Sequence, residues 1–424
     1  MSSLLKKAFA SPLPSVGEGW GGGFNRLLAH FIRAWRGFSK RDMAIRPLGQ
    51  TKFTGEFRVT RSSNGLYKIS PDKPNCRARA KTRVGAMSHS DSQVKVAIVG
   101  LGRFAHELAA ACQASERLTI ASCFTRNREN ARAFARKYGC ATAPSFAALL
   151  EDPAIEAVIL VTPNDLHCEQ TIAMARAGKH VFVEKPICNR LEEADWMIDA
   201  CAQAGVLLAV GHQERRHSAY RYMKKILVDG VLGRVRAFEA NHCGNLLAVW
   251  PQDDWRFSSQ GGGPILHKGI HKIDILNYLF GDVEAVATLG CDLPFNPRMH
   301  ATTVSAIRYA DGIVGSLSSG FAHTNTALNI YGDRRSMMYS GFGSCVQVKD
   351  EKTWDFETID CGPDRPLVEE LLEFAEAVRG RGRIEVDGQV ARKAVELATV
   401  LGQSARENRT VFLGETRRVE SSRR

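Results

Sequence analysis

The sequence predicts an α/β protein, with a doubly wound parallel sheet followed by a C-terminal α+β domain built on a large, open and mainly antiparallel sheet. Three observations lead to this prediction. Uninterrupted apolar runs alternate with helix-like stretches from Val94 onward, as expected for parallel strands that are covered on both faces. After about residue 230 the apolar and polar residues alternate within the runs, and helices between them become rare. A glycine turn, Gly100-Leu-Gly-Arg-Phe-Ala105, directly follows the first apolar run.

The individual elements can be assigned in chain order. The first part contains strands at 94–100, 118–124, 157–162, 180–184 and 206–211, with helices near 103–115, 128–138, 166–178 and 190–204. Repeated strand–helix units of this length form a doubly wound sheet, with ligands at the carboxyl ends of its strands. In the second part we expect strands at 235–241, 283–289, 303–309, 313–319 and 328–331, one helix near 264–280, and two late helices near 367–379 and 388–405.

The positive charge is concentrated in the first 86 of the 424 residues. They contain 17 Lys and Arg against 4 Asp and Glu, whereas the remainder contains 40 against 41. A nearly neutral remainder does not favour a nucleic-acid partner for the folded part. We therefore divide the chain into a basic, disordered leader (1–92), a dinucleotide-binding domain (93–213), a substrate-binding and oligomerisation domain (214–412) and a basic tail (413–424).

The leader has three interpretations. It could be an organelle transit peptide, a disordered extension, or sequence upstream of a true start at Met87, which is the reading we favour. The 11 cysteines are dispersed without zinc-finger spacing, which favours a reducing, cytoplasmic compartment. No apolar run reaches the roughly 18–20 residues that span a bilayer, so we expect no membrane partner.

The glycine turn has the pattern G-x-G-x-x-A, which allows a backbone to approach a pyrophosphate. Gly100, Gly102, Arg103 and Phe104 are therefore candidate cofactor contacts. The second strand ends at Thr125-Arg126, where NAD-binding folds carry an acidic residue. An arginine there suits the 2′-phosphate of NADP, so we favour NADP, with NAD left open because Glu129 is near.

Other candidate site residues also fall at predicted strand ends. Thr162 ends the third strand and Glu184 ends the fourth, directly before Lys185 and Pro186. A lysine in this position can donate a hydrogen bond to a substrate oxygen. This placement makes Lys185 the first candidate catalytic residue.

The helix after the glycine loop 261–263 carries His267, His271 and Asp274 on one face. An imidazole titrates near neutral pH and can accept an alcohol proton. Zinc binding and a purely structural role for the histidines are alternatives. We predict no metal, because no Glu follows the first histidine, and we expect Asp274 to hydrogen-bond locally. Arg256, just before the loop, is a candidate substrate contact.

The chain resembles the Gfo/Idh/MocA family from about Val94 to residue 412. The motifs that carry the resemblance are Gly100-Leu-Gly102, Thr162-Pro-Asn164, Glu184-Lys-Pro186, Val210-Gly-His-Gln213 with Arg215-Arg216, and Gly261-Gly-Gly-Pro-Ile-Leu-His267-Lys-Gly-Ile-His271.

The resemblance implies a Rossmann domain and an NAD(P)-dependent oxidoreductase of sugars, cyclitols or related hydroxylated compounds. Under it, Lys185 and His271 act on the substrate oxygen together with His267. The implied cofactor contacts are Thr162, Pro163, Asn164, His167, Glu184, Lys185 and Gln213.

One position departs from the family pattern: the family usually has Asp where this chain has His267, and the missing anion leaves the roles of the two histidines open. The family also forms homodimers or homotetramers, which we expect here through the C-terminal sheet. Two alternatives remain open, a glycosidase that uses NAD for transient oxidation and a non-catalytic dinucleotide or sugar sensor.

Overall fold

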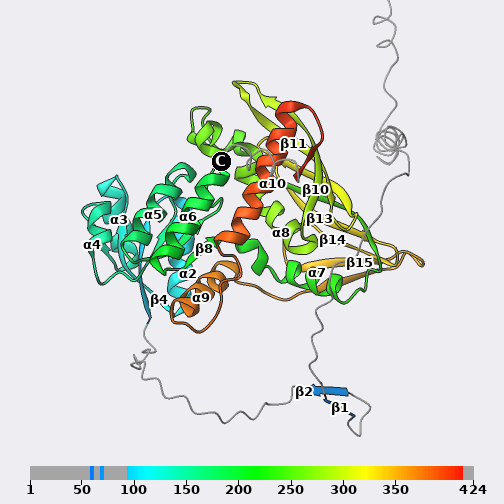
Figure 1. Cartoon of the computed structure of the whole chain (residues 1–424), viewed down its shortest axis with the longest axis horizontal. Coiled ribbons are helices and arrows are strands. Elements are labelled where there is room, and N and C mark those ends of the chain that lie inside the picture. The colour runs from blue at the N-terminus through cyan, green and yellow to red at the C-terminus, as the bar shows by residue number, and fades with distance from the viewer. Residues whose placement is uncertain (1–57, 62–66, 71–92, 414–424) are drawn as a thin grey trace, which may run out of the picture. The chain divides into compact units, whose positions relative to one another are not determined.

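The computed structural model describes residues 58–61, 67–70 and 93–413 (Figure 1). The chain divides into two compact units, Met1–Gly85 and Ala86–Arg424. In the first unit, strands β1 (Arg58–Arg61) and β2 (Tyr67–Ser70) pair antiparallel. We did not expect strands in this leader. The rest of the leader, Met87 and the tail from residue 414 lie outside the described residues, so their interpretations stay predictions.

The second unit begins with a six-stranded sheet in which every pair of neighbours is parallel. Its order is β5-β4-β3-β6-β7-β8. The strands are β3 (Val94–Val99), β4 (Leu118–Phe124), β5 (Ala141–Thr142), β6 (Ala157–Leu160), β7 (His180–Glu184) and β8 (Leu208–Gly211).

Both faces of this sheet are buried, as the apolar strands predicted. On β3, Val94, Val96 and Ile98 pack into one core, and Ala97 and Val99 into the other. The first core includes side chains of α2 (Arg103–Ser115), α3 (Arg128–Tyr138) and the late helix α9 (Pro366–Val378), and the second includes those of α4 (Phe146–Glu151), α5 (His167–Arg176) and α6 (Leu191–Ala204). This two-sided packing positions the strand ends that carry the site.

A nine-stranded sheet follows, in the order β16-β15-β14-β13-β9-β12-β11-β10-β17. All its neighbouring pairs are antiparallel except β12 with β9. The strands are β9 (Val235–Cys243), β10 (Val283–Leu293), β11 (Asn296–Tyr309), β12 (Val314–Gly320), β13 (Asn325–Gly332), β14 (Arg335–Tyr339), β15 (Cys345–Asp350), β16 (Phe356–Asp360) and β17 (Val411–Phe412).

Helices α7 (Ser218–Val228), α8 (Ile270–Phe280) and α10 (Gly388–Glu407) accompany this sheet. Helix α10, red in Figure 1, contacts both α6 and β8 of the parallel-sheet part and β10 and α8 of the later part. A π-helical turn, Ile265–Gly269, leads into α8. Single 3-10 turns occur at Asn164–Leu166, Gln213–Arg216, Leu246–Ala248, Trp255–Phe257 and Ser259–Gly261.

The predicted fold class is confirmed, and most predicted elements occur within a few residues of their expected bounds. Helices α4 and α7 and strands β5 and β14–β17 were missed. Strands β15 and β16 are only 6 and 5 residues long and contain few strongly apolar residues, so their signal in the sequence is weak. Within the described ranges, no helix is long and apolar enough to cross a membrane.

Candidate active site

The predicted cofactor contacts gather at the carboxyl ends of three adjacent strands. Gly100 follows β3, Thr125 and Arg126 follow β4, and Thr162 and Pro163 come just after β6. All five line one cavity of about 620 Å³. The parallel register of β4, β3 and β6 brings these residues, up to 63 positions apart in the chain, to one edge of the sheet.

Glycine is present at the two positions of the turn for different structural reasons. Gly100 has φ +87°, and a Cβ there would lie 2.6 Å from the carbonyl oxygen of Val161, so only glycine fits. Gly102 has φ −75° and open space where a Cβ would be. It precedes α2, whose first turn has no side-chain cap and no acidic residue. Unpaired amide groups at such a helix start can bind a phosphate.

Other predicted cofactor contacts are already engaged with the protein. The Thr162 hydroxyl donates to the Gln170 side chain at 2.7 Å. Both ring nitrogens of the buried His167 lie 2.9 Å from backbone carbonyls, those of Pro186 and Thr162. His167 therefore ties the loops after β6 and β7 together, and any effect it has on a cofactor is indirect.

Three further candidates lie nearby on the chain. The Asn164 side chain is buried and donates to Asn189 at 3.3 Å. Gln213 has a buried amide oxygen without a hydrogen-bond partner in the part of the chain that the structure describes. Arg103 is exposed and Phe104 is half-buried at the start of α2.

Lys185 and Glu184 lie together at the end of β7. Glu184 is 5% exposed, and one of its carboxylate oxygens accepts from the backbone amide of Lys185 at 3.2 Å. The Lys185 ammonium lies 3.4 Å from the backbone carbonyl oxygen of His267, so β7 and the π-helical turn meet here. Burial lowers the pKa of Lys185 and raises the pKa of Glu184. A lysine that loses its proton readily can exchange one with a substrate oxygen.

The two histidines predicted on one helix occur on two kinds of helix. His267 belongs to the π-helical turn and His271 to α8. Short π-helical segments are frequent at functional sites. The His267 ring lies edge-on between Trp255 and Phe321, and its Nδ1 is buried without a partner among the described residues. Burial, assisted by the Lys185 charge, lowers the pKa of both histidines well below the usual value.

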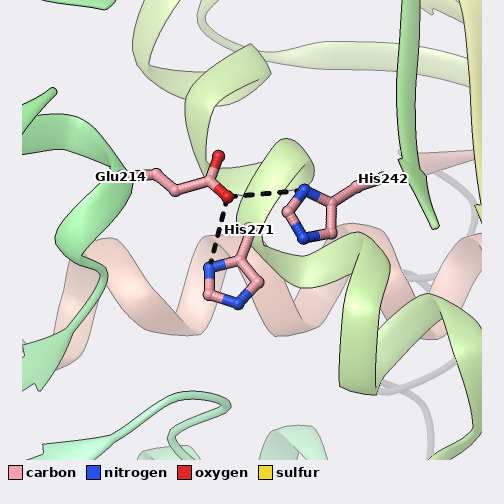
Figure 2. Close-up of side chains that lie close together, drawn as sticks. All are labelled: Glu214, His242 and His271. Atoms are coloured by element: carbon pink, nitrogen blue, oxygen red, sulfur yellow. Dashed lines mark ion pairs between the residues drawn. The ribbon is translucent and has the colours of Figure 1, made fainter. Parts of the chain in front are cut away.

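A carboxylate that was not among the predicted site residues lies at the centre of the site. Glu214, from the 3-10 turn after β8, has Oε1 3.4 Å from Nδ1 of His242 and 3.8 Å from Nδ1 of His271 (Figure 2). The two imidazole rings stack with centroids 4.8 Å apart. The anion that we judged absent at position 267 is thus supplied by another element. Nothing in the local sequence marked Glu214, because its partners come from β9 and α8.

Glu214 is held in place by a buried cation. The ammonium of Lys272, which is fully buried, lies 3.4 Å from its second oxygen and also donates to the Tyr220 hydroxyl. This attraction is a main reason why the pKa of Glu214 is lowered to about 2, against the effect of its burial. Glu214 is therefore an anion at every pH of interest.

Asp274 does not act locally, so this expectation was wrong. Its carboxylate makes two 2.6 Å hydrogen bonds to the guanidinium of Arg215, which is 59 residues away in the chain. It also lies 3.8 Å from the buried ring of His212. The pair fastens α8 to the turn that carries Glu214.

Arg256 is engaged as well. It pairs with Asp254 at 2.8 Å and its guanidinium lies 3.9 Å from the ring centroid of Trp250. These contacts hold the loop before the glycine segment, and they leave Arg256 less available as a primary substrate ligand.

Glu214, His242 and His271 are also residue types that bind metals, and their ligand atoms lie within 4.8 Å of one another. The ammonium of Lys272 competes for the carboxylate, and the charges of Lys185 and Lys268 act on the two histidines. Repulsion from these cations argues against a divalent ion. The predicted absence of a metal stays a prediction.

Comparison with known proteins identifies relatives of both parts of the chain. Residues 94–212 match the model of the oxidoreductase family with an NAD-binding Rossmann fold, GFO_IDH_MocA, and residues 220–338 match the GFO/IDH/MocA C-terminal domain.

Two curated relatives are similar over part of their length. The 1,5-anhydro-D-fructose reductase of Ensifer adhaerens is 30% identical over 227 residues, which are 52% of this chain and 67% of that protein. The 2,7-anhydro-N-acetylneuraminate hydratase of Escherichia coli K12 is 32% identical over 206 residues, 47% of this chain and 53% of that protein. The chain thus spans from about half to two thirds of the length of these relatives.

A solved structure agrees over a longer range. The crystal structure of a protein described as an oxidoreductase from Desulfitobacterium hafniense is 27% identical, with a TM-score of 0.71, and the match covers 76% of this chain and 99% of that one. Together with the two domain matches, these comparisons confirm the predicted family: the chain belongs to the Gfo/Idh/MocA oxidoreductase family.

Proposed function

We propose that this protein is an NAD(P)-dependent oxidoreductase that transfers hydride between the nicotinamide and a carbon of a sugar, cyclitol or related hydroxylated small molecule. One observation carries the proposal. Lys185 directly follows β7, in the sheet that also carries the glycine turn, and its charge acts on His271 of α8. The two groups can together manage an alcohol oxygen and its proton. Family membership supports the same reaction class.

The described residues fit a dinucleotide. The uncapped start of α2 and the open space above Gly102 suit a pyrophosphate. The cavity between Gly100 and Arg126 is large enough for an adenosine moiety. When bound, the nicotinamide would supply the hydride acceptor or donor. We propose 93–213 as the cofactor-binding domain and 214–412 as the substrate domain.

The protein's own groups then handle the oxygen and its proton. In the oxidation direction, Lys185 hydrogen-bonds the substrate hydroxyl, and a neutral His271 accepts the hydroxyl proton as the C–H bond transfers its hydride and the carbonyl forms. The carboxylate of Glu214 stabilises the resulting imidazolium, because an anion 3.8 Å away favours the charged ring. The ring of His242 stacks on that of His271 and lies beside the same carboxylate. His267 lines the same region and positions Lys185 through its backbone carbonyl.

NADP is the cofactor that we propose as preferred. Arg126 is exposed at the rim of the cavity with Thr125 beside it, and a guanidinium can pair with a 2′-phosphate in a bidentate manner. Replacing it, Arg126→Ala, should raise KM for NADP about tenfold or more and leave KM for NAD within about twofold. Equal changes for both cofactors would argue for NAD as the natural partner.

A second candidate is a redox-neutral reaction with transient oxidation, as in an NAD-dependent glycosidase. A relative named as a hydratase rather than a dehydrogenase supports keeping it. Reduced nicotinamide would then not accumulate while the substrate is consumed, which absorbance of the reduced cofactor and product analysis together would detect. A dinucleotide or sugar sensor is the third candidate. It would bind the same ligands without turning them over.

Lys185 gives the sharpest test of the oxidoreductase proposal. In a panel of sugars, sugar acids and inositols, the wild type should reduce NADP or NAD with at least one compound. Lys185→Ala should lower kcat by about a thousandfold and leave the cofactor Kd within threefold. Lys393→Ala, an exposed lysine paired with Asp282, is the control. Full turnover by Lys185→Ala would overturn the assignment.

Association through the C-terminal sheet remains part of the proposal. Leu289 and Val304 lie opposite each other on β10 and β11 and are 64% and 51% exposed. Apolar side chains paired on one sheet face are typical of an interface. We expect a dimer or tetramer in solution, in the cytoplasm, which light scattering and a Leu289→Asp variant would check.

A further inference from the structure

A lysine without a partner borders the proposed catalytic residues. Lys268 lies in the π-helical turn, between His267 and Gly269. Among the residues that the structure describes, no hydrogen-bond acceptor or ion-pair partner meets its ammonium group, although its side chain is only partly exposed. A partly buried cation without a protein partner is available to a ligand, because binding an anion there breaks no existing ion pair.

The neighbouring charges do not compensate Lys268. Glu214, the carboxylate that acts on it, already lies close to His242 and His271 (Figure 2) and to the ammonium of Lys272. Besides burial, the charge of Lys268 contributes to the lowered pKa of Lys185, and the charge of Arg256 contributes in the same way to the lowered pKa of Lys268. The site thus has an excess of positive charge before any substrate enters.

Lys268 lines a cavity of about 420 Å³ together with His242, Asn245, Trp250 and Thr324. The cavity reaches the catalytic residues through His242, whose ring stacks on that of His271. Amide and hydroxyl groups beside an indole suit a hydroxylated ring.

Gly244 leaves the space that the end of the Lys268 side chain occupies. A Cβ on Gly244 would lie 2.5 Å from Cε and 2.8 Å from Nζ of Lys268. Any larger residue would displace the ammonium from its position.

We propose that this cavity binds an anionic group of the substrate, a carboxylate or a phosphate, through Lys268. The substrate is then an acidic sugar derivative whose charged group lies away from the carbon that is oxidised. The inference rests on the proposed function and adds the substrate class to it. It also explains the charge balance, because an anion beside Lys268 neutralises the excess and lets Lys185 keep its proton more readily.

The test compares matched anionic and neutral compounds with the full-length protein and its cofactor. D-glucuronate, D-gluconate and glucose 6-phosphate form the anionic arm, and D-glucose, D-glucitol and myo-inositol form the neutral arm. We expect kcat/KM, or the Kd of the ternary complex with reduced cofactor from calorimetry, to favour the anionic arm at least tenfold. Comparing kcat/KM for the two carboxylates with that for the phosphate shows which anion the cavity binds.

Variants assign the preference to Lys268. Lys268→Met should lower kcat/KM for anionic compounds about 10- to 100-fold more than for neutral ones. Gly244→Ala should act in the same direction, and Lys393→Met should leave both arms unchanged.

The outcomes separate the two proposals. Equal use of both arms, or an equal loss for both in Lys268→Met, would overturn the inference and leave the oxidoreductase intact. Absence of turnover with every compound, but Lys268-dependent binding of the anionic arm, would overturn the proposed function alone.

Discussion

Glu214 allows the most direct test of the active-site geometry, through the isosteric change Glu214→Gln. The change removes the anion 3.8 Å from His271 and keeps the shape of the side chain. Two unit charges at about 4 Å interact by about 4 kcal/mol at an effective dielectric constant of 20. Lys272, 3.4 Å from the second carboxylate oxygen, offsets part of this attraction. We take about 2 kcal/mol as the stabilisation of the imidazolium, which corresponds to about a 30-fold lower kcat.

The assay is kcat for substrate oxidation as a function of pH, with Glu214→Asp as the variant that keeps the charge. His271 has to be neutral to accept a proton. Loss of the anion lowers its pKa further, so the acid limb of the profile should move to lower pH in Glu214→Gln and stay nearly in place in Glu214→Asp.

The same change should destabilise the fold. The fully buried Lys272 loses its charged partner and retains the Tyr220 hydroxyl. We expect about 3 kcal/mol less unfolding free energy, measured by urea denaturation. A folded Glu214→Gln enzyme with wild-type kcat and an unmoved acid limb would refute the role of Glu214 in positioning and charging His271.

The remaining predictions concern the glycine turn, pH and metal. Gly100→Ala should lower the melting temperature strongly, because its Cβ would clash with the Val161 carbonyl and its φ is positive. Gly102→Ala should fold normally and bind NADP at least tenfold more weakly. Similar melting temperatures for the two variants would contradict these roles. The pKa of His242 is lowered to about 3 by burial. The unfolded chain therefore binds the proton first, and unfolding free energy should fall as pH drops below 6.5, by up to about 1.4 kcal/mol per unit. His242→Gln should lack this part of the slope between pH 7.5 and 5.5, and an unchanged slope would disprove it. EDTA should leave turnover unaltered, and a loss restored by zinc or manganese would establish a metal at Glu214.

The parallel sheet could be predicted almost completely because its information is local. Strand β3 is an uninterrupted apolar run next to a glycine turn, and that pattern depends only on neighbours in the chain. The later strands β15 and β16 could not be predicted, because β15 joins the sheet only by pairing with β14, and β16 only by pairing with β15. Their stability comes from partners that the sequence does not place beside them.

The sequence by itself determined the residues of the turn, the strand-end lysine Lys185 and the helical histidines His267 and His271, because strand ends and helix periodicity are properties of short segments. Only the tertiary structure decided what surrounds them. It places Glu214 beside His271, pairs Asp274 with the distant Arg215, and leaves Lys268 without a partner among the described residues, beside a cavity. Electrostatic contacts act through space between separate elements, so the charge of the site, unlike its residue types, follows from the packing of the fold.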